Sequence, residues 1–186
     1  QLKAVSSSAL NQEVIKYGSL SEFYSLSDES NQSHEYTVAW VDCLATGEKL
    51  GRGHFIRANH AKVSQPKPSA PKLKLSVPVE LPVPLVNSWS LKAFNSAYYH
   101  RQQSRYQYST VHYDPFFYPL DGIKNWNRIY GPDGFLQYQC VVPPENSESA
   151  IAEILARIAR SGVGSFLAVL KVFGKKPSPG LLSFPR

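Results

Sequence analysis

The stretch EYTVAWV at residues 35–41 and the stretch GRGHFIRA at residues 51–58 decide the fold that we expect. In the first stretch every second side chain, ending with Trp40, falls on one side of an extended backbone, because successive side chains of a strand point to opposite faces. The tripeptide ATG at residues 45–47 marks a turn between the two stretches. The pattern therefore predicts a strand that turns and returns as a second strand.

A strand and a helix precede this pair. Residues 12–17 (QEVIKY) have the composition of a short strand. Ser19 and Glu22 form an S-x-x-E capping box, which predicts a helix that begins there and runs to about Ser27. The first part of the chain is thus predicted to be strand–helix–strand–strand.

Residues 62–86 form a different kind of segment, with six prolines. Proline removes backbone donors and blocks helix formation, so we expect a long loop or linker. Four lysines without an acidic neighbour lie at its start, and they indicate either a solvated loop or contact with phosphate or an anionic surface. These lysines are Lys62, Lys67, Lys72 and Lys74.

The second half repeats the strand–helix–strand order. A helix opened by Asn87 or Ser88 and a strand at 106–113 come first. Residues 135–142 alternate as a strand, residues 147–161 carry apolar side chains at helical spacing, and residues 164–173 form the last strand. Gly162 is placed to end the helix. We therefore predict one α+β domain over residues 1–186, an antiparallel or mixed sheet with helices packed on one face, built from two strand–helix–strand units.

The composition excludes several classes of protein. With 42% hydrophobic and 18% charged residues the chain is globular, and no apolar run reaches the ~18 residues that cross a bilayer. The net charge of +6 is compatible with nucleic acid, anionic lipid or phosphorylated substrates. Glycine-rich nucleotide motifs, HExxH and GxSxG are absent, and the five histidines lack metal-ligand spacing. We expect no catalytic residue and no metal site in this chain.

Two isolated cysteines predict neither a disulfide framework nor a metal site. Cys140 lies within the alternating stretch at 135–142. We expect it to be a small buried thiol.

Gln137, Gln139 and Lys171 are polar residues at alternating strand positions. Two amides on one strand face either reach solvent or line a polar pocket. Lys171 shares its face with apolar residues, so it either reaches water or serves an anionic or hydroxyl-bearing ligand. If the two strands are neighbours, the three side chains face one cavity.

The segment HYDPFFYPLDGIKNWNRIYGPDGF at residues 112–135 is dense in aromatic and turn-forming residues. Interleaved aromatics can stack sugars or bases. The same composition is typical of a large ordered loop that packs on itself. Both interpretations stay open.

Several stretches together resemble one family. They are EYTVAWVDC at 35–43, LGRG at 50–53, FYPLD at 117–121, WNRIYGPDGFLQYQ at 126–139 and SFLAVLKVFG at 165–174. They are similar to the cap, or substrate, domain of FAD-linked oxidases of the vanillyl-alcohol-oxidase type.

The resemblance implies a division of labour. In the family an FAD-binding lobe holds most of the cofactor, and the cap binds a sugar-type or polyprenyl-linked substrate whose alcohol is oxidised by hydride transfer to flavin. The catalytic lysine and the flavin-contacting glycine-rich loop have no counterpart here, so the fragment alone is expected to be inactive. The substrate-binding residues that the resemblance implies are Gln137, Gln139, Lys171, Phe173, Val169, Trp40, Tyr118 and Leu120.

The chain begins QLKAVSSS without an initiator methionine and stops at LLSFPR, and we expect both ends to be internal to a longer polypeptide. For that polypeptide a bacterial cytoplasmic location, or a peripheral one at the inner membrane, is expected, with membrane contact left open. One alternative is a stand-alone binding module for an anionic sugar or lipid. A basic RNA-binding domain is another, but the sheet lacks the aromatic pattern of such domains, and we expect no nucleic acid partner.

Overall fold

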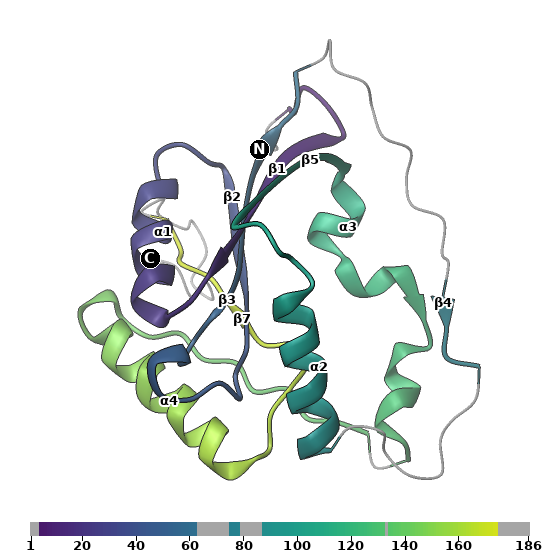
Figure 1. Ribbon diagram of the computed structural model, residues 1–186. Helices are drawn as coiled ribbons and strands as arrows, with labels where there is room; N and C mark the ends of the chain where they lie inside the picture. The colour runs from purple at the N-terminus through teal and green to yellow at the C-terminus, as the bar shows by residue number, and fades with distance from the viewer. Residues whose placement is uncertain (1–3, 63–74, 79–86, 133, 175–186) are drawn as a thin grey trace, which may run out of the picture.

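The computed structural model describes residues 4–62, 75–78, 87–132 and 134–174 (Figure 1). The helices are α1 (Leu20–Ser30), α2 (Ser88–His100), α3 (Tyr113–Phe117) and α4 (Ser147–Ser161). The strands are β1 (Ala9–Tyr17), β2 (Tyr36–Val41), β3 (Gly53–His60), β4 (Leu75–Ser76), β5 (Tyr106–His112), β6 (Ile123–Lys124) and β7 (Val169–Leu170). None of the helices in these ranges is long and apolar enough to cross a bilayer.

Five strands form one sheet in the order β5-β1-β3-β2-β7, and every neighbouring pair is antiparallel. A small parallel pair, β4 with β6, lies apart from it. The predicted α+β class is confirmed. The strands β2 and β3 are neighbours in the sequence as well as in the sheet. By contrast, β1 and β5 pair although they lie far apart in the sequence.

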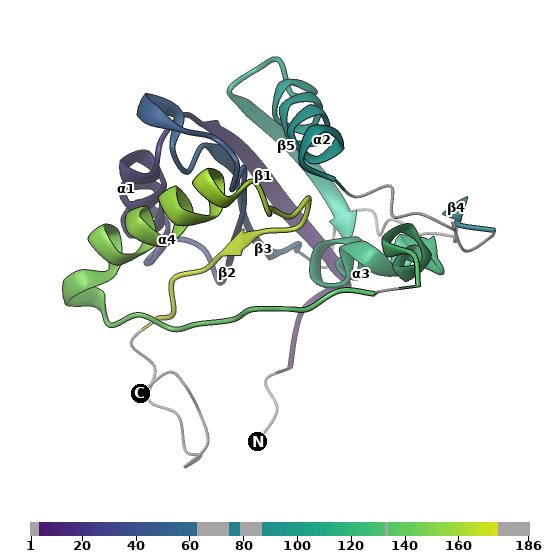
Figure 2. The same ribbon diagram turned by 90° about the horizontal axis from the view of Figure 1, so that it is seen from below.

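The strand register sorts the side chains onto two faces. Ile15, Phe55 and Ala39 lie opposite one another and are buried against α1 and α4, which lie together on that face (Figure 2). The opposite face carries Trp40 and His54, whose rings pack against Tyr98 of α2. The alternation of residues 35–41 therefore separates two faces. The helices α1 and α4 cover one of them, as predicted, but α2 packs on the other, because Trp40 and His54 offer it an apolar and aromatic surface there.

Local signals explain how the helices begin and end. The Ser19 hydroxyl accepts from the Glu22 amide at 3.4 Å, and the Glu22 carboxylate accepts from the Gly18 amide at 2.8 Å, one residue before the position of a regular capping box. The helix continues to Ser30, three residues further than predicted. Asn87 caps α2 through two backbone amides, and Gly162 ends α4 with a φ of 70°.

Two of the predicted strands are wrong in extent. Residues 135–142 form no strand, and the strand predicted at 164–173 is reduced to the two residues of β7. An alternating stretch becomes a strand only where a partner strand supplies backbone hydrogen bonds. Within residues 134–174, which the structure describes, only Val169 and Leu170 have such a partner, which is β2. Cys140, expected to be buried in this strand, is exposed, and Cys43 is the buried thiol.

The predicted proline- and lysine-rich loop at 62–86 lies largely outside the described residues. Lys67, Lys72 and Lys74 fall in the part that is not described, whereas Lys62 is exposed at the end of the chain segment that follows β3.

Candidate functional site

Trp40 is the best-defined member of the predicted substrate-binding set. It is buried, and its indole Nε1 donates a hydrogen bond to the Phe166 carbonyl at 2.9 Å. Its ring packs on Tyr98, with 4.6 Å between centroids, and on His54, with 5.7 Å. The side chain is thus fixed by one hydrogen bond and by ring packing on two neighbours.

Three more predicted residues lie on β7, the strand that pairs with β2 at Trp40, and on the residues directly after it. Val169 lies directly opposite Trp40 in the β2–β7 pair and is 45% exposed. Lys171 is exposed two residues further, and Phe173 is 52% exposed. Trp40 and Val169 are therefore brought together, with Lys171 and Phe173 on the chain that leaves the sheet edge.

The remaining predicted residues lie on two other segments of the chain. Gln137 and Gln139 are exposed on the extended segment that leads to α4, and no hydrogen bond joins them to Lys171 in the described part of the chain. Tyr118 caps the short helix α3 through its backbone amide and is exposed, while Leu120 is half-buried in the turn that follows. Strand pairing thus brings Trp40 and Val169 together, and the common pocket of all eight residues stays a prediction.

An aromatic chain nevertheless connects the base of the segment 134–143 to Trp40. Phe135 stacks on Tyr130 at 4.6 Å, Tyr130 on Phe166 at 5.8 Å, and Phe166 meets Phe94 of α2 at 5.8 Å. Phe94 in turn stacks on Tyr98, the neighbour of Trp40. Of the two interpretations of residues 112–135, the packing within 126–135 is that of an ordered segment packed on its own aromatics.

Buried polar groups lie beneath this region. Asp42 is buried and accepts from Arg52 at 2.8 Å and from the amide of Asn95 at 3.2 Å. Burial, and after it the positive charge of Arg101, lowers the pKa of His54 to about 4. Burial raises the pKa of the Cys43 thiol. At neutral pH these groups are a neutral imidazole and a protonated thiol, so they act as structural groups here.

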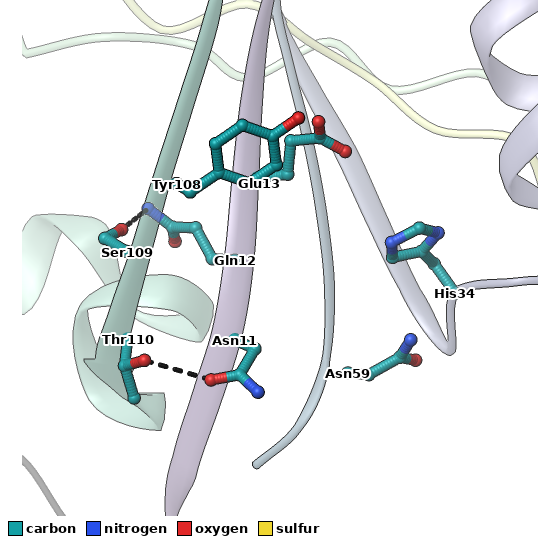
Figure 3. A pocket seen from close by; sticks show the side chains of 8 residues that line it. All are labelled: Asn11, Gln12, Glu13, His34, Asn59, Tyr108, Ser109 and Thr110. Atoms are coloured by element: carbon teal, nitrogen blue, oxygen red, sulfur yellow. Dashed lines mark hydrogen bonds between the residues drawn. The ribbon is translucent and has the colours of Figure 1, made fainter. Parts of the chain in front are cut away.

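A second feature is a polar depression of about 500 Å³ on the opposite side of the sheet from Trp40 (Figure 3). Its lining residues come from β1, β3, β5 and the turn before β2: Asn11, Gln12, Glu13, His34, Asn59, Tyr108, Ser109 and Thr110. The sequence does carry a signal for it, since Asn11 and Glu13 interrupt the face on which Ile15 and Tyr17 are buried.

The starts of the three longer helices offer little to the phosphates of FAD. A helix N-terminus binds phosphate through unpaired backbone amides, but the Ser19 side chain already accepts from one amide of the first turn of α1, and Asn87 accepts from two in α2. The start of α4 carries Glu145 and Glu148, whose charge opposes an anion. No cluster of metal-ligating side chains occurs among the residues that the structure describes.

Two relatives are informative. The chain is 38% identical over 178 residues to decaprenylphosphoryl-beta-D-ribose oxidase of Mycolicibacterium smegmatis (strain ATCC 700084 / mc(2)155), which covers 90% of this chain and 38% of that protein. It is 28% identical over 200 residues to an uncharacterized protein in mprA 5'region of Streptomyces coelicolor, which covers 100% of this chain and 53% of that protein. No protein-family model matches the chain.

The chain spans 38% and 53% of the lengths of these two relatives. Its similarity to the first is spread over nine tenths of its own residues. The relationship to an oxidase that the motifs at 35–43, 126–139 and 165–174 indicate is confirmed: this chain is related to part of decaprenylphosphoryl-beta-D-ribose oxidase.

Proposed function

We propose that this chain is the substrate-binding cap region of an FAD-dependent oxidoreductase of the vanillyl-alcohol-oxidase type, which oxidises the hydroxyl of a sugar-type alcohol. The single observation that carries the proposal is the 38% identity to the oxidase over 90% of the chain. The name of that relative specifies a ribose linked to a decaprenyl phosphate. We therefore propose a sugar-type or polyprenyl-linked substrate for the longer polypeptide.

The chemistry of the predicted residues suits such a substrate. Sugar hydroxyls both donate and accept hydrogen bonds, and the amides of Gln137 and Gln139 do the same. The exposed ammonium of Lys171 is suited to the negative charge of a phosphate. Trp40 and Val169 offer a fixed apolar surface next to these polar groups.

The exposed apolar side chains near this set support a covering partner. Leu136 is fully exposed, Tyr138 is 78% exposed, and Val169 and Phe173 are about half exposed. Apolar side chains that are exposed to this degree, if they form one patch, are typical of interfaces. We propose that the FAD-binding lobe of the longer polypeptide covers them.

The cofactor itself would be bound largely by segments outside this chain, consistent with the capped helix ends described above. When bound, flavin supplies the acceptor for the hydride. The residues of this chain would bind the substrate, orient its hydroxyl and exclude water. The chain alone is then inactive and colourless, and a flavin absorption band in the purified chain would contradict this. Peripheral attachment to an inner membrane stays a proposal that follows from a lipid-linked substrate.

The test is Gln139→Ala in the full-length protein. We expect kcat/KM to fall about 10-fold or more, because a hydrogen bond to a substrate hydroxyl is lost, while the flavin-to-protein absorbance ratio stays the same. Gln107→Ala is the matched control, since it removes an exposed amide from β5, at the far edge of the sheet. Loss of flavin from Gln139→Ala, or unchanged turnover, would overturn the assignment.

A further inference from the structure

We propose that the polar depression of Figure 3 is a second binding site, for one ring of a neutral polyhydroxylated ligand such as a pentose or hexose unit. It lies on the helix-covered face of the sheet, whereas Trp40 lies on the opposite face. The inference is therefore independent of the proposed function.

Rigid strands supply most of the site. Asn11 of β1 lies opposite Asn59 of β3 on one side and opposite Thr110 of β5 on the other. Glu13 lies opposite Tyr108 in the same register. Paired strand positions share a face, so these side chains line one opening, as Figure 3 shows for Asn11, Asn59 and Glu13.

The floor of the depression carries one guanidinium that is shared by two carboxylates. Glu13 and Arg57 are both buried, and the Arg57 Nε lies 2.5 Å from the Glu13 carboxylate. Arg57 also donates to Glu29 at 2.9 Å and to the Ser30 hydroxyl at 3.1 Å. Burial alone would raise the pKa of Glu13, but the Tyr108 hydroxyl and Arg57 outweigh it and lower the pKa. The Glu13 carboxylate is ionised and already paired with Arg57, and the cluster as a whole keeps one negative charge, which disfavours an anion. The amides and hydroxyls that line the rest of the opening suit a neutral ligand.

His34 offers a polar group that can act in both directions. Its Nδ1 is bonded to the Ser33 hydroxyl at 2.9 Å, which leaves Nε2 for a ligand. Asn59 fixes the turn that carries His34, because its amide accepts from the Glu35 backbone and donates to the Ser33 carbonyl, each at 2.8 Å. Burial and the charge of Arg57 lower the pKa of His34. A neutral imidazole can donate to or accept from a sugar hydroxyl.

Tyr108 supplies an aromatic surface at the rim. The residue is 73% exposed, and its hydroxyl lies beside the Glu13 carboxylate (Figure 3). The ring is therefore held at its polar end and open on its apolar body. An aromatic face beside amides, hydroxyls and an imidazole matches a sugar ring, which has both apolar C–H faces and hydroxyl edges.

The experiment is a ¹H–¹⁵N NMR titration of this chain with methyl β-D-ribofuranoside. We expect dose-dependent shifts of the amides of Glu13, His34, Asn59 and Tyr108. Tyr108→Ala should weaken binding about 10-fold, the effect of losing an aromatic contact of 1 to 1.5 kcal/mol. Tyr106→Ala is the matched control, since it removes an exposed tyrosine from the same strand and the same face. Both spectra also report whether the variant is folded.

Several outcomes would overturn the proposal. These are the absence of shifts, shifts that map to Trp40 and Val169 instead, or an unaltered affinity of folded Tyr108→Ala. Stronger binding of tetramethylammonium or inorganic phosphate at the same amides would show a charged ligand and contradict a neutral one. The sugar titration is read at the amides around Glu13, and the proposed function is read in the turnover of full-length Gln139→Ala, so failure of one proposal is separable from failure of the other.

Discussion

Residues 9–60 and residues 134–173 each place a helix between two extended stretches, but they differ in whether the extended stretches have partners. In the first region β1 and β3 pair over eight positions, and β2 joins β3 over six. In the second region α4 is a regular helix of 15 residues, while only two residues of the extended stretches pair with the sheet. In the second region the predicted helix thus forms in full, whereas the predicted strands largely do not.

The difference follows from where backbone hydrogen bonds are made. A helix satisfies its amides within one segment, so an amphipathic pattern with suitable ends is enough to form α4. A strand needs a second segment, and β1 obtains it on both sides whereas residues 135–142 obtain it on neither. Stability is therefore concentrated in the first region, and exposed apolar surface is concentrated in the second.

The largest expected effect compares two phenylalanines. Phe55 of β3 is 1% exposed and packs on Phe23, whereas Phe173 is half exposed. Phe55→Ala should lower the free energy of unfolding by about 4 kcal/mol through lost burial and the cavity left behind. Phe173→Ala should change it by less than about 0.5 kcal/mol. Urea denaturation followed by circular dichroism measures both, and equal losses would show that the second region is as tightly packed as the first.

Acid should act on the first region through His54. Its pKa is about 4 in the folded protein against 6.5 as the ordinary value, so the unfolded chain binds a proton first as the pH falls. The stability linked to the neutral imidazole is complete above pH 6.5 and is lost progressively toward pH 4, by about 3 kcal/mol at most. Urea midpoints measured from pH 7 to pH 4.5 test this. His54→Leu should flatten that part of the pH profile, and an equally steep profile in the variant would exclude His54 as its source.

The smallest expected effect concerns helix starts. The Ser19 side chain accepts from a backbone amide of α1, but Asn146 makes no such bond at the start of α4. Ser19→Ala should cost about 1 kcal/mol, and Asn146→Ala should cost less than about 0.5 kcal/mol. Thermal unfolding of the two variants checks the difference, which a similar fall in Tm for both would contradict.

Local patterns in the sequence predict much of the fold. The spacing of apolar residues and Gly162 give the bounds of α4, and alternation around Trp40 gives the two faces of β2. The strand predicted at 135–142 fails because alternation does not reveal a partner. Hydrogen bonds between distant segments depend on the whole topology, which a local pattern does not contain.

The candidate site is predicted less completely, for the same reason. Trp40 and Val169 meet because the β2–β7 register places them opposite each other. The depression around Glu13 was not predicted, since Asn59 and Tyr108 reach it only through the pairing of β1 with β3 and β5. Its one local signal is a pair of polar residues, Asn11 and Glu13, on a strand face that is otherwise apolar.

The hydrogen bond from Trp40 to Phe166 has a consequence for the newly made chain. The two residues are separated by 126 positions. At the usual elongation rate, ribosomes need roughly 6 to 25 s to synthesise that length. During this interval the β2 edge has emerged without β7, and the indole has not met its acceptor. The nascent polypeptide therefore exposes an unpaired sheet edge for several seconds. During this time the edge can pair with other chains, and binding by a chaperone would prevent that.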